Sequence, residues 1–132
     1  MSQTILVVED EPASLRLISY FLHNQGYHVL EARDGLEAME LVSQLRFDIV
    51  VSDLKMPRMD GVALARQLLS KSPITPVLLM SGYAADDLEA LLELGVPCLS
   101  KPLALEQLLS KIETVLSYAA HTCIILLYAA CI

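Results

Sequence analysis

Cysteine and basic residues are scarce in this 132-residue sequence. Its three cysteines, Cys98, Cys123 and Cys131, fit neither a zinc-ligand spacing nor a CxxC motif. Because their number is odd and the chain can bury a core without disulfides, we expect reduced thiols and a cytoplasmic location. The sequence contains nine Lys and Arg residues and sixteen Asp and Glu residues, which gives a formal net charge of −7. The basic residues do not cluster either, so direct nucleic-acid binding is not expected.

The sequence also lacks an export signal, internal repeats and low-complexity tracts. The first four residues contain no Lys or Arg, and the apolar run that follows them ends at Glu9. Hydrophobic residues make up 55% of the chain, which excludes disorder over most of its length. A chain of this length predicts one domain, with room for a short appendage.

Short β-rich segments alternate with amphipathic stretches of helical length. We expect five strands, at Thr4–Val8, Tyr27–Glu31, Asp48–Ser52, Pro76–Met80 and Val96–Ser100. Five helices are expected, after Pro12, Asp34, Gly61 and Pro102 and over residues 84–94. Near-continuous apolar strands such as Ile49–Val51 are typical of a parallel sheet that helices cover on both faces. The pattern predicts a doubly wound α/β domain with a five-stranded parallel sheet of order 2-1-3-4-5.

Chemically active side chains follow the predicted strands, at the edge where an open α/β sheet places its site. Glu9 and Asp10 follow the first strand, Asp53 the third, and Lys101 the fifth. Three carboxylates in one pocket repel each other, so we expect a cation, and hard oxygen ligands favour Mg²⁺. Carboxylates, a divalent cation and a lysine together suit phosphoryl transfer.

Four groups of residues, in order along the chain, carry a family resemblance. They are Val7–Pro12, Val50–Pro57 with Met59–Gly61, Met80–Gly82 and Ser100–Pro102. Together they resemble the receiver domain of bacterial two-component response regulators, of the single-domain chemotaxis-regulator-like type. The resemblance covers residues 4 to 117 and implies a flavodoxin-like fold.

The resemblance also implies a role for each site residue. Asp53 is expected to accept a phosphoryl group from a histidine kinase, a phosphotransfer protein or a small phosphodonor. Lys101 is expected to pair with the phosphoryl oxygens, and Ser81 to donate its hydroxyl to them. The expected Mg²⁺ ligands are Glu9, Asp10, Asp53 and the backbone carbonyl of Lys55. Pro102 is expected to follow a cis peptide bond, as it does in the family.

Two positions affect how such a domain would signal. Many receivers carry an aromatic residue three positions before the lysine, and here that position is Cys98. A thiol side chain is too small to occupy the volume that a rotating aromatic ring occupies. We therefore expect the signal to be conveyed differently or mainly through loop and helix movement. Tyr83, two residues after Ser81, is expected to shield the acyl phosphate from water.

The C-terminus departs from the family pattern. Residues 114–132 carry no formal charge, and residues 123–132 are apolar on every side of a helix. We divide the chain into a receiver domain, 1–118, and an apolar extension, 119–132, expected to continue the last helix. The extension could pack on a second protomer, fold back, touch or span a membrane, or come from truncation or an altered reading frame. Dimerisation is the leading explanation, and membrane contact is not expected because polar residues interrupt the run.

The leading functional hypothesis is a phosphorylation-activated response regulator that signals to a downstream protein through protein–protein contacts. It is expected to catalyse only its own phosphorylation and dephosphorylation, and not to be a turnover enzyme. The alternatives are a receiver-fold assembly module whose tail drives dimerisation, and a receiver fragment of a longer multidomain regulator. A haloacid-dehalogenase-type phosphatase is discounted, because it needs a second Asp where this chain has Lys55.

Overall fold

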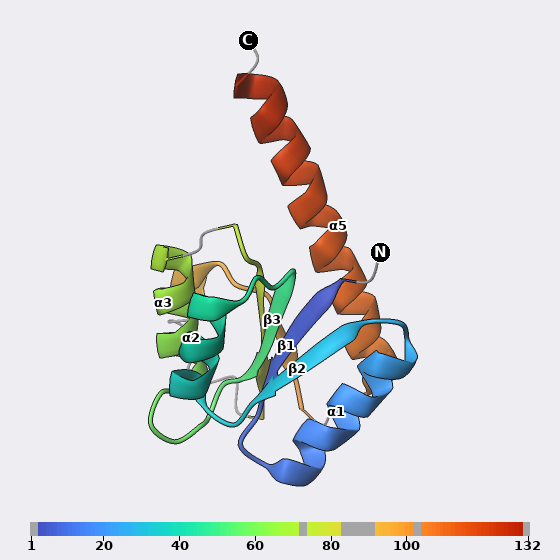
Figure 1. The fold of residues 1–132 in the computed structure, drawn as a ribbon, viewed down its shortest axis with the longest axis vertical. Coiled ribbons are helices and arrows are strands. Elements are labelled where there is room, and N and C mark those ends of the chain that lie inside the picture. Colours follow the sequence, from blue (N-terminus) through green and yellow to red (C-terminus); the bar gives the residue numbers. More distant parts are fainter. Residues whose placement is uncertain (1–2, 72–73, 83–91, 102–103, 131–132) are drawn as a thin grey trace.

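A computed structural model describes residues 3–71, 74–82, 92–101 and 104–130, with side chains through Tyr118. The strands form one parallel sheet of order β2-β1-β3-β4-β5, which confirms the predicted fold (Figure 1). Their bounds are β1 (Thr4–Val8), β2 (His28–Ala32), β3 (Ile49–Asp53), β4 (Val77–Ser81) and β5 (Cys98–Ser100).

The helices cover both faces of this sheet (Figure 1). Their bounds are α1 (Pro12–Asn24), α2 (Gly35–Gln44), α3 (Gly61–Lys71) and α5 (Leu105–Ala130). Residues 92–94 are helical, whereas residues 83–91 lie outside the described part of the chain. The helix expected over residues 84–94 therefore lies mostly outside the described residues.

Alternate residues of the buried strands point to opposite faces of the sheet, and each face has its own core. Leu6 and Val8 of β1 pack with residues of α2 and α3. Ile5 and Val7 pack with residues of α1 and α5. All four side chains are fully buried. Because β1 and β3 are covered on both sides, their carboxyl ends form a rigid edge for the residues that follow.

The sheet differs from the sequence prediction at strand ends. β2, β3 and β4 begin and end one residue later than predicted, and β5 is two residues shorter. Asp53 belongs to β3 because it pairs in register with Met80 of β4. Asp48 lies before β3, where its carboxylate accepts a hydrogen bond from the backbone N–H of Thr4 at 2.7 Å. Asp53 and Ser81 thus end their strands inside the hydrogen-bonded ladder, which limits their movement.

Local signals in the sequence account for the helix ends near the site. The Asp34 carboxylate caps α2 by accepting a hydrogen bond from the Glu37 N–H at 2.9 Å, as predicted. Asp60 accepts one from the Ala63 N–H at 2.8 Å at the start of α3. Gly26, after α1, has a φ of 99°, a conformation that glycine adopts readily.

α5 packs on the sheet only along its first part. Leu108, Ile112 and Leu116 are buried, whereas Tyr118 is 71% exposed. The helix then continues to Ala130, away from the rest of the domain (Figure 1). Among the described residues, no helix is both long enough and apolar enough to cross a membrane.

Candidate functional site

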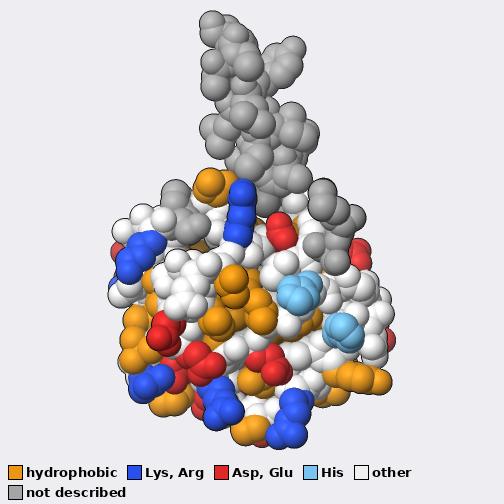
Figure 2. Space-filling view, in the orientation of Figure 1, with side chains coloured by type: hydrophobic (Ala, Val, Ile, Leu, Met, Phe, Trp, Pro, Cys, Tyr) orange, Lys and Arg blue, Asp and Glu red, His pale blue; other side chains and the backbone are white. Residues whose placement is uncertain are grey.

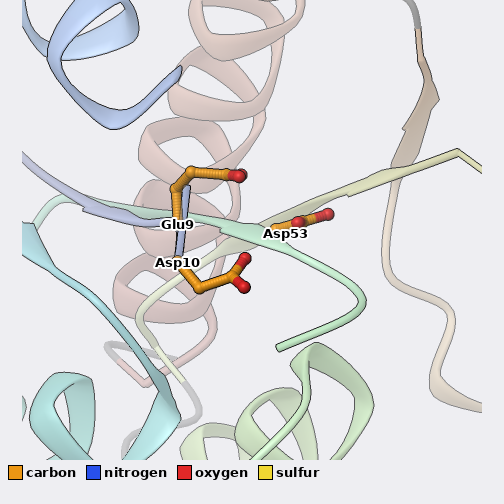
Figure 3. A group of neighbouring side chains, drawn as sticks. All are labelled: Glu9, Asp10 and Asp53. Atoms are coloured by element: carbon orange, nitrogen blue, oxygen red, sulfur yellow. The ribbon is translucent and has the colours of Figure 1, made fainter. Parts of the chain in front are cut away.

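Three carboxylates meet at the carboxyl edge of the sheet. Glu9 and Asp10 directly follow β1, and Asp53 ends the neighbouring β3. One carboxylate oxygen from each residue lies within 4.8 Å of the other two (Figure 3). Glu9 and Asp53 are buried and Asp10 is exposed. The structure therefore brings together the three carboxylates expected from the sequence.

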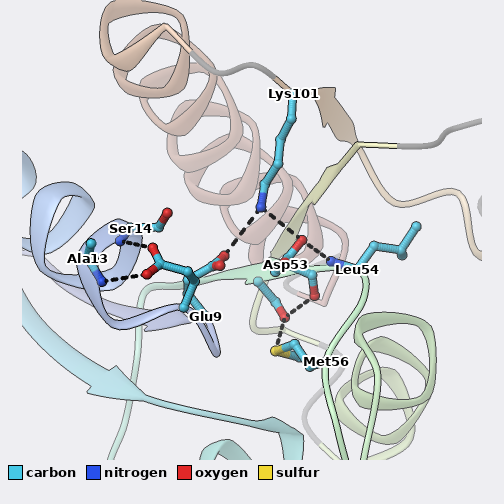
Figure 4. Close-up of polar contacts among 9 residues, drawn as sticks. Glu9, Ala13, Ser14, Asp53, Leu54, Met56 and Lys101 are labelled. Atoms are coloured by element: carbon cyan, nitrogen blue, oxygen red, sulfur yellow. Dashed lines mark hydrogen bonds and ion pairs between the residues drawn. The ribbon is translucent and has the colours of Figure 1, made fainter.

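Lys101 directly follows β5, and its side chain extends toward this cluster (Figure 4). Its Nζ lies 3.3 Å from Oδ1 of Asp53 and 3.5 Å from Oε2 of Glu9. The same Asp53 oxygen accepts a hydrogen bond from the Leu54 N–H at 2.9 Å. Oδ1 of Asp53 is thus held by both the Lys101 ammonium and a backbone N–H.

The close charges and the burial shift two pKa values in the site. Burial, together with the nearby charge of Asp53, raises the pKa of Glu9 from 4.5 to about 7. Burial lowers the pKa of Lys101, but the carboxylates of Asp53 and Glu9 outweigh it and raise that pKa above its usual value. Lys101 therefore stays charged, and one lysine does not offset three carboxylates.

The donor set fits a divalent cation. Among the described residues, no group donates a hydrogen bond to the buried Oε2 of Glu9, and the Lys101 ammonium lies 3.5 Å from it. An ionised carboxylate oxygen without a hydrogen-bond donor is costly, and a metal ion can supply the missing interaction. The three carboxylates offer only oxygen ligands, one of them open to water, which is the chemistry that Mg²⁺ prefers.

Ser81 lies at the end of β4, and Lys55 lies just beyond the end of β3. Ser81 ends β4 and is buried, and its carbonyl accepts a hydrogen bond from the Lys101 N–H at 2.7 Å. The structure thus places Ser81 and Lys101 at the same edge of the sheet as Asp53. Lys55, with an exposed side chain, lies two residues beyond Asp53 in the loop to α3.

Other predicted residues fall outside the cluster or outside the described residues. Cys98 begins β5 and is half-buried against the core on the α2 and α3 side, where burial raises the pKa of its thiol. Tyr83 and Pro102 lie outside the described residues, so the shielding role and the cis peptide bond stay predictions.

Two contacts near the site were not predicted from the sequence. Glu11 caps α1 by accepting hydrogen bonds from the N–H groups of Ala13 and Ser14, and a carboxylate directly before Pro12 was the available signal. Arg58, in the loop after β3, pairs with Asp34 across 24 positions of sequence. No short-range pattern reveals the second contact.

The sheet and its acidic edge define a doubly wound α/β domain with a carboxylate cluster and a lysine beyond its strands. The family model described as "Response regulator receiver domain" matches residues 5–113. The chain therefore belongs to the response regulator receiver domain family, which confirms the resemblance seen in its sequence.

Relatives of this chain include both regulators and kinases. Transcriptional regulatory protein ZraR of Escherichia coli O157:H7 is 36% identical over 123 residues, which cover 92% of this chain and 27% of ZraR. Sensor kinase CckA of Brucella abortus is 40% identical over 121 residues, which cover 87% of this chain and 13% of CckA. The chain thus spans about a quarter of the first relative and less of the second.

Solved structures agree with this fold. A CheY-like response regulator receiver domain protein from Methanospirillum hungatei has a TM-score of 0.88 at 26% identity, covering 92% of this chain and 99% of that one. Response regulator TrrA from Thermotoga maritima, solved in complex with Mg²⁺ and BeF, has a TM-score of 0.78 at 26% identity. That match covers 86% of this chain and 98% of TrrA.

Proposed function

We propose that this chain is a phosphorylation-activated response regulator of a two-component system. The observation that carries the proposal is the cluster of Glu9, Asp10 and Asp53 with Lys101 beside it. Glu9, Asp10, Asp53 and the Lys55 carbonyl are the proposed Mg²⁺ ligands. When bound, Mg²⁺ offsets the negative charge that carboxylates and phosphoryl oxygens bring together.

Asp53 is the proposed phosphoacceptor. One of its carboxylate oxygens attacks the phosphorus of a phosphohistidine, the P–N bond breaks, and the imidazole leaves with the bonding electron pair and takes up a proton. The product is an acyl phosphate on Asp53. Lys101, already 3.3 Å from Asp53, is positioned to pair with the phosphoryl oxygens. Ser81, on the adjacent strand, is proposed to donate its hydroxyl to them.

The proposed partners are proteins. A histidine kinase or phosphotransfer protein supplies the phosphoryl group, and a downstream protein reads the phosphorylated domain. On the face shown in Figure 2, Lys and Arg side chains are interspersed with Asp and Glu side chains. This mixture, with a net charge of −7, favours a protein partner over a direct nucleic-acid contact. We further propose a cytoplasmic location and no turnover of a separate substrate.

Beryllofluoride, a phosphoryl mimic, tests the proposal directly. Added with Mg²⁺ to the full chain, it is expected to give a bound fluorine signal in ¹⁹F NMR. Asp53→Asn is expected to abolish that signal. The matched control is Asp60→Asn, because Asp60 is a nearby carboxylate that caps α3 and an asparagine keeps this cap. Equal binding by the wild type and Asp53→Asn would contradict the proposal.

A second proposed function is self-association through the extension of α5. The helix continues to Ala130 beyond Leu116, and the sequence carries no charge after Glu113. A helix without charged residues that extends beyond its own domain exposes apolar surface to water. It is stabilised when a second copy of the chain covers that surface. Sedimentation of the full chain is expected to show a dimer, and a chain that ends at Tyr118 a monomer. Monomers in both cases would exclude this function.

A further inference from the structure

The loop that joins β3 to α3 carries Lys55 and is anchored at both ends next to the acid cluster. Leu54 is buried, its N–H donates to the Met80 carbonyl at 2.9 Å, and its own carbonyl accepts from the Gly61 N–H at 2.8 Å. Between these anchors, Met56 and Met59 of the loop pack against the core on the α2 and α3 side of the sheet. Figure 1 shows the loop passing close to the start of α2, at the end of the sheet where β1 ends.

Arg58 adds a polar contact between the loop and the start of α2. Its Nε and Nη2 both donate to Oδ2 of Asp34, at 2.9 and 2.6 Å, while Oδ1 of Asp34 caps α2. Gly35 and Met59, the residues that follow Asp34 and Arg58, also lie close together. A Cβ placed on Gly35 would lie 2.6 Å from the carbonyl oxygen of Met59. Two consecutive loop residues therefore rest on two consecutive residues at the start of α2.

The backbone at Arg58 shows that this conformation is not the loop's own preference. Arg58 has a φ of 66°, which favours glycine, and no other described non-glycine residue has a positive φ. The Met59 N–H donates to the Pro57 carbonyl at 2.7 Å, which closes a three-residue turn around Arg58. A positive φ at the centre of such a turn is its rarer and more strained form. The surroundings of the loop must therefore hold this turn in place.

We propose that the Arg58–Asp34 ion pair is a positioning device that sets the Mg²⁺ affinity of the acid cluster. The pair holds the loop in the shape that presents the Lys55 carbonyl next to Asp53. An ion pair in which Arg58 is 57% exposed contributes little to the stability of the whole domain. Its effect is local, on the segment between Leu54 and Gly61. The inference rests on the proposed function, because it assigns Mg²⁺ to the same cluster.

Two substitutions remove the ion pair and spare the local backbone. Asp34→Asn keeps an excellent cap for α2, and Arg58→Asn places at the strained position a residue that tolerates positive φ. The control is Glu93→Gln, which removes the exposed ion pair between Nη2 of Arg66 and Oε2 of Glu93, 3.7 Å apart. All three variants keep the residues of the acid cluster.

Isothermal titration of the full chain with Mg²⁺ is the first measurement. Asp34→Asn and Arg58→Asn are each expected to weaken Mg²⁺ binding about ten-fold, at the lower end of the effect of losing an outer contact of a metal site. The double variant is expected to be no weaker than either single variant, because both remove the same interaction. Glu93→Gln is expected to bind Mg²⁺ as the wild type does. Unchanged affinity in the two single variants, or additive losses in the double variant, would overturn the inference.

Amide hydrogen exchange in the metal-free chain is the second measurement, and it is independent of Mg²⁺. Residues 55–61 are expected to exchange faster in Asp34→Asn and Arg58→Asn than in the wild type and Glu93→Gln. Unaltered exchange would overturn the positioning role and leave the proposed function standing. A wild-type chain that binds no Mg²⁺ would overturn the proposed function, and this use of the ion pair with it.

Discussion

Replacement of Glu9 by glutamine removes a buried negative charge and keeps the shape of the side chain. The Glu9 side chain is 2% exposed, and its pKa rises from 4.5 to about 7 mainly through burial. The folded chain thus holds this proton more tightly than the unfolded chain does. The free energy of unfolding of the metal-free protein must therefore fall as the pH rises through this range.

The size of the effect follows from the two pKa values. At 1.36 kcal/mol per pH unit, the raised pKa of Glu9 lowers the free energy of unfolding by about 3 kcal/mol at pH 8 and by about 1 kcal/mol at pH 5. Glutamine resembles the protonated form and avoids this cost. Glu9→Gln is expected to stabilise the metal-free chain by up to about 3 kcal/mol at pH 8 and by much less at pH 5.

Urea unfolding in the presence of a chelator, at pH 5 and pH 8, measures this difference. Glu40→Gln, at an exposed position of α2, is the control and is expected to show no such dependence on pH. Saturating Mg²⁺ at pH 8 is expected to stabilise the wild type more than Glu9→Gln, because the metal ion favours the ionised carboxylate. The reasoning fails if Glu9→Gln changes stability equally at both pH values, or destabilises the chain at pH 8.

Three further substitutions have defined outcomes. Lys101→Met is expected to lower the rate of phosphorylation by acetyl phosphate about 100-fold and to raise Mg²⁺ affinity, since a competing cation is gone; weaker Mg²⁺ binding in titration would contradict this. Asp34→Ala is expected to cost about 1 kcal/mol in urea unfolding, most of it regained by Asp34→Asn, which keeps the cap. Gly61→Ala is expected to cost about 1–3 kcal/mol, because its Cβ would lie 2.5 Å from the Asp53 carbonyl oxygen; an unchanged melting temperature would disprove that clash.

The fold was predictable because its signals are local. The apolar run Ile49–Val51 predicts a strand buried on both faces, and the structure buries all three residues completely. Asp34 and Gly26 mark helix ends through interactions with their own neighbours. The site was predictable for a related reason, since parallel strands place the residues that follow them at one edge of the sheet.

Features that depend on distant parts of the chain were not predictable. The Arg58–Asp34 pair joins residues 24 positions apart, and arginine is not a residue that signals a positive φ. The raised pKa of Glu9 depends on how deeply the cluster is buried and on the charge of Asp53, both set by tertiary packing. The extent of β5 depends on its pairing with β4, which begins in register only at Cys98.

The central claim is that Asp53 accepts a phosphoryl group with the help of Mg²⁺. The most direct measurement is the mass of the full chain, and of its proteolytic peptides, after incubation with acetyl phosphate and Mg²⁺. The account predicts one added phosphoryl group, located on Asp53, and none in Asp53→Asn or in the presence of a chelator. Absence of the group in correctly folded wild-type protein, or its attachment to a different residue, would contradict the account.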